Sequence, residues 1–430
     1  MSASLILFLV VFLVLLLLGT PVAWTMVVSS IIWIAFTGQW YLLPVFPERI
    51  FQNMNSFTLL AIPLFILAGE IINQGKITDR LVHFANLAFG WIRGGLAHVN
   101  IGSSILFSGI TGVALGDIAA LGKVFIPSMV KQGYSPAYAA AVTASSSIIG
   151  PMVPPSLIIV IYGSVTGVSI GALLLACIIP GILIGVSQMI LVYVQARIHG
   201  IESVKADRSA KVLAKATGAA SLPLMVPVII ILGIVGGIMT PTEAGAAAAF
   251  YALILCMVVY RSIKVRELYD VFKRSMTFTG QLVIIVGCGG VFAWVMGIEN
   301  VPSMLSGFLA AQDISPAMTL IVFNIFLLFL GMFIDPSAAI ILFGPILAQA
   351  AATVGVNPLH FGVVMILNLN IGLLTPPLGV CLFAAERIAQ CGLGQLIRKN
   401  APFLAVSIVA LLLVTYIPQF SLWLPRTLGF

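Results

Sequence analysis

Charged side chains are scarce in this sequence. Only 8% of its 430 residues are Asp, Glu, Lys or Arg, whereas 61% are hydrophobic. Soluble domains carry about 25% charged residues, and a chain of this length cannot cover a water-facing surface with so few. A soluble globular protein is therefore excluded. The composition predicts an all-α polytopic membrane protein that is surrounded by the lipid bilayer.

Catalytic and metal-binding patterns are missing as well. The five cysteines stand singly, and the four histidines are scattered without the spacing that metal ligands or a catalytic nucleophile require. No glycine-rich loop of the Walker type occurs, so ATP does not drive this chain directly. We expect no enzyme and no cofactor, and an ion gradient remains as the energy source. The net charge of +7 is assigned to cytoplasmic loops, not to nucleic-acid binding.

Apolar stretches long enough to cross a membrane recur along the chain. The first lacks the basic n-region and the cleavage site of a signal peptide, so we expect it to remain as a span. The ten predicted crossings are residues 4–18, 21–37, 57–73, 137–164, 170–196, 222–238, 241–260, 277–298, 358–386 and 401–424. The segments 76–94 and 301–312 mix charged with apolar residues and are predicted to lie in the interface.

Two further apolar stretches, 97–130 and 316–352, do not fit simple crossings. Each contains small or hydroxyl residues and an acid near its middle, which indicates a re-entrant helical hairpin whose tip lies in protein or in a polar cavity. With this topology and both termini in the periplasm, all Lys and Arg residues except Arg49 and Arg426 lie on the cytoplasmic side. This distribution follows the positive-inside rule, and a crossing hairpin would destroy it.

The chain also contains an internal repeat. A shift of 222 residues places Gly133, Pro136, Gly150 and Pro154-Pro155 on Gly355, Pro358, Gly372 and Pro376-Pro377. We predict a first repeat at 1–196, a basic cytoplasmic linker at 197–217 and a second repeat at 218–430. Five crossings in each half force the second half to be inverted, which is a recurring plan of secondary transporters.

Two predicted helices are interrupted in mid-membrane by the same motif. Gly150-x-x-x-Pro154-Pro155 breaks the helix at 137–164, and Gly372-x-x-x-Pro376-Pro377 breaks the helix at 358–386. Proline removes a backbone donor and glycine permits a tight turn, so the unwound carbonyl oxygens need a partner. A desolvated cation is one such partner. A kink that is absorbed by neighbouring helices is the alternative interpretation.

Two acids lie near the middle of the predicted hairpins. Asp335 precedes Pro336 and is a good N-cap for the returning limb of its hairpin, and Asp117 can cap in the same way. Capping does not exclude ion coordination, because acids within the membrane are costly and often functional. Glu70 and Glu243 lie near span ends, where snorkelling or capping explains them.

Several motifs resemble those of one transporter family. Pro63-Leu-Phe-Ile-Leu-Ala-Gly69, Phe107-Ser-Gly-Ile-Thr-Gly112, Gly133-Tyr-Ser-Pro136 and the two Gly-x-x-x-Pro-Pro motifs are similar to those of the large membrane subunit of tripartite ATP-independent periplasmic (TRAP) transporters. The resemblance covers almost the whole chain. It implies a sodium-coupled elevator that imports organic acids across the bacterial inner membrane.

The resemblance also implies two sodium sites. The first would use Ser108, Thr111, Gly112, Asp117, Ser146, Ser147, Gly150 and Pro154, and the second would use Gly331, Asp335, Ser337, Asn370, Gly372 and Thr375. Substrate would bind near the hairpin tips and Pro155, Ser156, Pro376 and Pro377. Many family members have Gly-Ser-Ser at the first tip, whereas this chain has Gly112-Val113-Ala114. Backbone carbonyls or Asp117 would then have to replace the missing hydroxyl ligands.

Two partners follow from the same resemblance. They are a small four-helix membrane subunit, expected as a separate chain, and a periplasmic protein that delivers substrate. The pattern is closer to the branch that handles sugar acids such as sialic acid than to the C4-dicarboxylate branch. The alternatives are a stand-alone ion-coupled anion symporter and a passive channel subunit.

Overall fold

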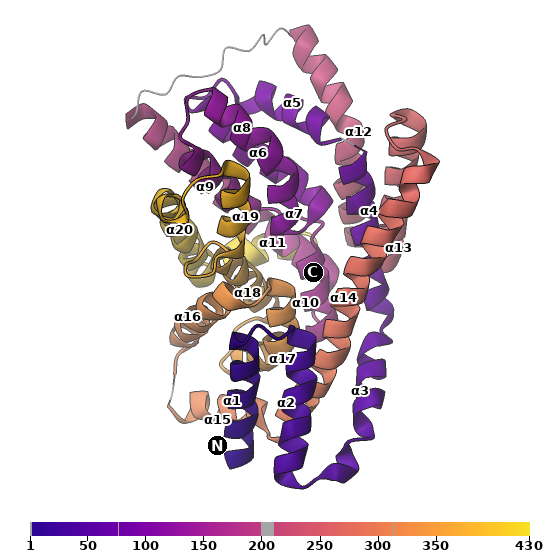
Figure 1. The fold of residues 1–430 in the computed structure, drawn as a ribbon, viewed down its shortest axis with the longest axis vertical. Helices are drawn as coiled ribbons and strands as arrows, with labels where there is room; N and C mark the ends of the chain where they lie inside the picture. Colours follow the sequence, from indigo (N-terminus) through magenta and orange to yellow (C-terminus); the bar gives the residue numbers. More distant parts are fainter. Residues whose placement is uncertain (1, 76, 199–209, 313) are drawn as a thin grey trace.

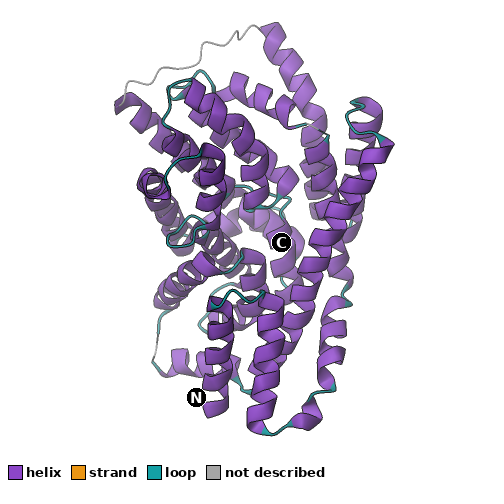
Figure 2. Ribbon diagram, in the orientation of Figure 1, coloured by secondary structure: helices purple, strands orange, loops and turns teal. Residues whose placement is uncertain are grey.

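The computed structural model describes residues 2–75, 77–198, 210–312 and 314–430. Every regular element within these residues is a helix (Figure 2), and seven helices are long and apolar enough to cross a membrane. The prediction of an all-α polytopic membrane protein is therefore confirmed. Five shorter apolar helices of 10–17 residues accompany the seven.

Among the described residues, the first half of the chain contains eleven α-helices and three short 3-10 or π segments. They are α1 (Ala3–Leu17), α2 (Val22–Thr37), η1 (Trp40–Leu42), α3 (Val45–Met54), η2 (Phe57–Leu60), α4 (Ala61–Gln74), α5 (Thr78–Phe89), α6 (Gly95–Thr111), α7 (Ala114–Asp117), η3 (Ile118–Gly122), α8 (Lys123–Lys131), α9 (Pro136–Ser147), α10 (Leu157–Thr166) and α11 (Ile170–Ile198).

The part of the second half that the structure describes contains ten α-helices and one π segment. They are α12 (Ala210–Val235), α13 (Pro241–Ile254), η4 (Leu255–Val259), α14 (Val265–Ile298), α15 (Val301–Ala311), α16 (Pro316–Phe333), α17 (Pro336–Thr353), α18 (Pro358–Gly372), α19 (Val380–Ala389), α20 (Leu393–Tyr416) and α21 (Gln419–Thr427). The linker predicted at 197–217 overlaps α11 and α12, and its residues 199–209 lie outside the described part of the chain.

Helix starts follow a simple local rule. Five helices begin with proline at the first helical position, directly after a residue whose side chain accepts a hydrogen bond from the first turn. The capping residues are Ser135, Thr240, Ser315, Asp335 and Asn357. Glu243 completes a capping box with Thr240, as its place near a span end suggests.

The helices form two groups (Figure 1). Long α14 packs against α2, α3 and α4, and α4 packs against α13. We call this group, together with α1 and α12, the scaffold. The second group consists of the hairpin α6–α8, the hairpin α16–α17 and the helices α9, α10, α18, α19 and α20 between them.

Helices α9 and α18 form the centre of the second group. All residues of α18 from His360 to Gly372 are buried, and almost all of α9 is buried as well. A helix that is buried on all sides belongs to the core. The Ala- and Ser-rich sequence of α9 lets neighbouring backbones approach closely, so the polar side chains of both helices are enclosed by protein.

Within the scaffold, Glu299 at the end of α14 binds both α1 and α2. Its carboxylate accepts hydrogen bonds from Trp33 Nε1 at 2.7 Å, from Ser4 Oγ at 2.6 Å and from the hydroxyl of Ser2. Burial raises the pKa of Glu299, but these three hydrogen bonds outweigh burial and hold the pKa below its ordinary value.

Candidate functional site

The first hairpin touches the first broken helix at its tip. α6 ends at Thr111, and Gly112 follows with φ +59°, a conformation that glycine adopts without strain. A Cβ atom on Gly112 would lie 3.1 Å from the Leu157 nitrogen and 3.3 Å from Cα of Ser156. The side chain of Thr111 lies outside the described part of the structure. The tip of the hairpin therefore packs against the turn that begins α10.

Asp117 packs against the interruption itself. A Cβ atom on Gly150 would lie 2.1 Å from Asp117 Oδ2, so only glycine leaves room for this carboxylate. Asp117 is the last residue of α7 and does not cap it, because α7 begins at Ala114. The expected capping role is therefore wrong. A buried carboxylate beside the unwound segment remains a candidate ligand for a cation.

Hydroxyl and amide groups join α6 to α9. Asn100 Nδ2 donates to Thr143 Oγ1 at 2.7 Å, and Ser104 Oγ donates to Ser146 Oγ at 2.9 Å. Ser108 and Ser147 donate within their own helices, to Ile105 O at 2.6 Å and to Ala144 O at 2.7 Å. Neither Asn100 nor Ser104 is among the site residues predicted from the sequence. Their four-residue spacing with Ser108 places all three on one helix face.

The second hairpin meets the second broken helix through two glycines. A Cβ atom on Gly372 would lie 2.6 Å from Gly331 Cα, and one on Gly331 would lie 2.9 Å from Leu369 O. Backbone therefore rests directly on backbone. At the tip, Asp335 caps α17 as predicted, with Oδ1 accepting from the Ser337 nitrogen at 2.8 Å.

The second interruption carries two more of the predicted residues. Asn370 Nδ2 donates to Ile366 O at 2.7 Å, and Thr375 Oγ1 donates to Ile371 O at 3.0 Å. Asn370 Oδ1 is buried without a hydrogen-bond partner among the described residues. An acceptor oxygen of this kind costs about 1–3 kcal/mol unless it is paired, so it is the clearest candidate for a cation ligand.

Both Pro-Pro motifs lie between helices. α9 ends at Ser147 and α10 begins at Leu157, while α18 ends at Gly372 and α19 begins at Val380. The peptide bonds Pro154–Pro155 and Pro376–Pro377 are cis. Ser156 is buried, whereas Pro377 is exposed. Both predicted interruptions are thus present in the backbone.

A cavity of about 440 Å³ lies between the scaffold and the two hairpin tips. The tips and the first interruption contribute Gly112, Pro155, Asp335 and Ser337, whereas α4, α12 and α14 line the opposite side. Pro376 and Pro377 are not among the lining residues. The cavity therefore brings together hairpin tips from both halves of the chain. The sequence had assigned these tips to separate sodium sites but expected substrate near both of them.

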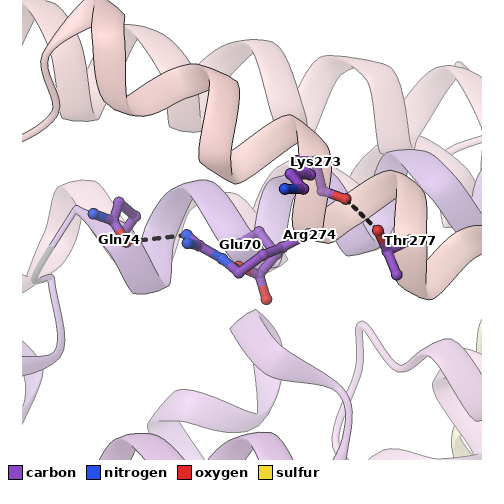
Figure 3. Close-up of polar contacts among 5 residues, drawn as sticks. All are labelled: Glu70, Gln74, Lys273, Arg274 and Thr277. Atoms are coloured by element: carbon purple, nitrogen blue, oxygen red, sulfur yellow. Dashed lines mark hydrogen bonds and ion pairs between the residues drawn. The ribbon is translucent and has the colours of Figure 1, made fainter.

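An ion pair lies at the mouth of this cavity. A second hollow of about 510 Å³, which we call the vestibule, shares Glu70, Phe278 and Gln281 with the cavity and adds Asp270, Lys273, Arg274 and Thr277. Arg274 donates from Nε to Glu70 Oε2 at 3.0 Å and from Nη2 to Gln74 Oε1 at 3.0 Å (Figure 3). Glu70 therefore lies near a span end, lines the cavity and forms an ion pair with Arg274.

The described residues contain no group of three His, Cys, Asp or Glu side chains that could hold a metal ion. The cation ligands available at the two interruptions are main-chain carbonyls, hydroxyls, the Asn370 amide and single carboxylates. Such neutral and singly charged oxygen ligands suit a weakly held alkali cation at unwound helices.

Comparisons with known proteins agree with this architecture. Residues 9–420 match the family described as the DctM component of tripartite ATP-independent periplasmic transporters. The chain is 39% identical over 409 residues to the sialic acid TRAP transporter large permease protein SiaM of Vibrio cholerae, covering 95% of each chain. It is 37% identical over 381 residues to the C4-dicarboxylate TRAP transporter large permease protein DctM of Pseudomonas aeruginosa, covering 89% of each.

Among solved structures, the chain is similar to the YdaH transporter of Alcanivorax borkumensis. The TM-score is 0.65 at 14% sequence identity, with 90% of each chain covered. At this identity the similarity concerns the fold alone.

Proposed function

The chain belongs to the DctM family of TRAP transporter large permeases, and on this premise we propose that it is the sodium-coupled subunit of an organic-acid importer. It is a membrane transport subunit, not an enzyme. We further propose that it works with a small four-helix membrane subunit and receives its substrate from a periplasmic binding protein in the bacterial inner membrane.

The proposed sodium sites lie where each hairpin meets its broken helix. Two observations support the second site best: the direct backbone contact between Gly331 and Gly372, and the buried, unpartnered Oδ1 of Asn370 in the last turn of the same helix. Unwound carbonyls and a buried amide oxygen leave negative partial charge that a desolvated cation neutralises. The close approach of Asp117 to Gly150 supports the matching site in the first half.

The proposed substrate site is the 440 Å³ cavity. Its described lining residues include no Lys, Arg or His, so a substrate carboxylate needs positive charge from another source. The first turns of α10 at Leu157 and α17 at Ser337 reach the cavity, and helix N-termini stabilise anions. A cation bound beside Asp335 would add to this effect and would couple sodium binding to substrate binding.

The arrangement also supports an elevator. Scaffold helices line one side of the cavity and hairpin tips line the other, so a sliding motion of the second helix group would carry the cavity across the membrane.

Relatives named for sialic acid and for C4-dicarboxylates are similarly distant. We propose a sugar acid such as sialic acid, because the sequence pattern is closer to the branch of the family that handles sugar acids, and the relative named for sialic acid is 39% identical.

The experiment reconstitutes the chain in proteoliposomes with its small subunit and its binding protein. Uptake of radiolabelled N-acetylneuraminate and succinate is measured with an inward sodium gradient and with choline in place of sodium. Accumulation above equilibrium that needs both sodium and the binding protein supports the proposal. Accumulation without the binding protein would indicate a stand-alone symporter, and equilibration without accumulation would indicate a passive channel. Either result refutes the proposal.

A further inference from the structure

Asn400 lies between the two broken helices. It is 1% exposed and stands on α20, which packs against both α9 and α18. Its Nδ2 donates to Leu374 O at 3.2 Å, and its Oδ1 accepts from Ser145 Oγ at 2.8 Å. One amide therefore binds the second interruption through its donor and the first broken helix through its acceptor.

The two bonded residues adjoin the proposed cation ligands. Leu374 directly precedes Thr375, and Ser145 directly precedes Ser146 and Ser147. Ser145 is also held from the other side, because Gln188 Nε2 of α11 donates to its carbonyl at 2.9 Å. A shift of the Leu374 carbonyl is thus transmitted through one rigid planar amide to the last turn of α9.

We infer that Asn400 is a positioning residue that couples the two interruptions, so that a cation bound at one strengthens cation binding at the other. The inference rests on the proposed sodium sites. Coupling between sites needs a contiguous physical link that both sites bias. The Ser145–Asn400–Leu374 hydrogen bonds supply such a link between the two halves of the chain.

The link acts by fixing one geometry for both interruptions. When a cation draws the carbonyls around Thr375 together, the Leu374 peptide turns and carries the Asn400 amide with it. The Ser145 hydroxyl follows, and the last turn of α9 is ordered before the second cation binds. The second cation therefore meets a site whose ordering is already complete, which gives positive cooperativity.

The test measures sodium titration of the thermal unfolding midpoint, with potassium as the reference, on the chain in lipid nanodiscs with its small subunit. The variants are Asn400→Leu, which removes both bonds, and Ser145→Ala, which removes one. Ser407→Ala is the matched control, because this buried hydroxyl of α20 bonds only to Phe403 O of its own helix.

We expect a Hill coefficient clearly above one in the wild type and in Ser407→Ala. Ser145→Ala should lower the coefficient towards one and raise the sodium midpoint about fivefold, the value of one hydrogen bond. The double variant Ser145→Ala/Asn400→Leu should have the same Hill coefficient and sodium midpoint as Asn400→Leu alone, because both substitutions break the same link. Ser145→Ala keeps the test valid if Asn400→Leu does not fold.

An unchanged Hill coefficient in Ser145→Ala and Asn400→Leu would overturn the inference. A coefficient of one in the wild type would also overturn it, while the proposed sodium coupling would stand. A wild type whose midpoint responds equally to sodium and potassium would overturn the proposed function, and the inference with it.

Discussion

Gly372→Ala tests the contact between the second hairpin and the second interruption. The added methyl carbon would lie 2.6 Å from Cα, 2.7 Å from C and 3.0 Å from O of Gly331. Carbon atoms in favourable contact lie about 3.5–4.0 Å apart. Both partners are backbone, so no side chain can rotate away, and the two segments must separate by about 1 Å.

Overpacking of this kind costs about 1–3 kcal/mol. If the separation also opens the cation site, the free energy of sodium binding is weakened by a similar amount. A loss of about 1.4 kcal/mol corresponds to a tenfold weaker sodium affinity. We therefore expect the sodium concentration at half-maximal thermal stabilisation to rise about tenfold in Gly372→Ala. The measurement is thermal unfolding of the protein in lipid nanodiscs, titrated with sodium at constant ionic strength.

Gly394→Ala is the matched control. Gly394 lies in α20, and a Cβ atom there would meet nothing within 4 Å. Alanine is the better helix former, so this variant should be unchanged or slightly more stable. Equal sodium midpoints for the wild type and Gly372→Ala would refute the argument, because the contact would then be unrelated to the cation site.

Three further predictions concern single side chains. Asn370→Leu and Thr375→Val should each raise the sodium midpoint of thermal unfolding, because each removes an oxygen beside the second interruption; unchanged midpoints would move that site elsewhere. Arg274→Gln should alter stability by less than about 1 kcal/mol, because the pair with Glu70 is 48% and 31% exposed, yet it should slow uptake by removing a cation from the vestibule. Arg266→Gln, an exposed position on the same helix, should leave uptake unchanged, and equal slowing in both would refute a local role. Because the folded pKa of Glu299 is lowered, its stabilising effect is complete above the ordinary value of 4.5 and is lost as the pH falls through the folded pKa. In Glu299→Gln the free energy of unfolding should fall less steeply with pH below pH 4.5 than in the wild type. The same pH profile in both proteins would contradict the proposed role of Glu299.

Local chemistry explains what the sequence predicted well. The pairs of a capping residue and proline, such as Ser135-Pro136 and Asn357-Pro358, begin helices where the sequence indicates. The Gly-x-x-x-Pro-Pro motifs interrupt helices because proline lacks a backbone N–H donor and its ring clashes with the preceding helical turn. These effects act within a few residues, so one sequence suffices to locate them.

Asn400 could not be found in this way. It follows Arg398 and Lys399, and the sequence therefore assigns it to the cytoplasmic side, next to a span that was expected to start at residue 401. In the structure α20 begins at Leu393, so Asn400 lies in the second turn of that helix and is buried against α9 and α18. Only the packing of helices from both halves distinguishes it from its charged neighbours.

The sodium sites predicted from the sequence do not show that one cavity joins them. Gly112 and Asp335 are more than two hundred residues apart and were assigned to different sodium sites, although substrate was expected near both hairpin tips, and in the structure both residues line one cavity. Asp117 and Gly150 are 33 positions apart in the sequence, and only the resemblance to a known family placed them in one site. Contacts between distant segments depend on how the hairpins enter the helix bundle, which no local pattern encodes.

Equilibrium binding of radioactive sodium to the protein in nanodiscs tests the central claim most directly. The account predicts saturable sodium binding that potassium does not displace. Gly150→Ala should weaken binding at the first proposed site, and Gly372→Ala should weaken binding at the second. The double variant should lose binding at both sites. Absence of saturable sodium binding in the wild type, or binding that neither glycine substitution alters, would contradict the account.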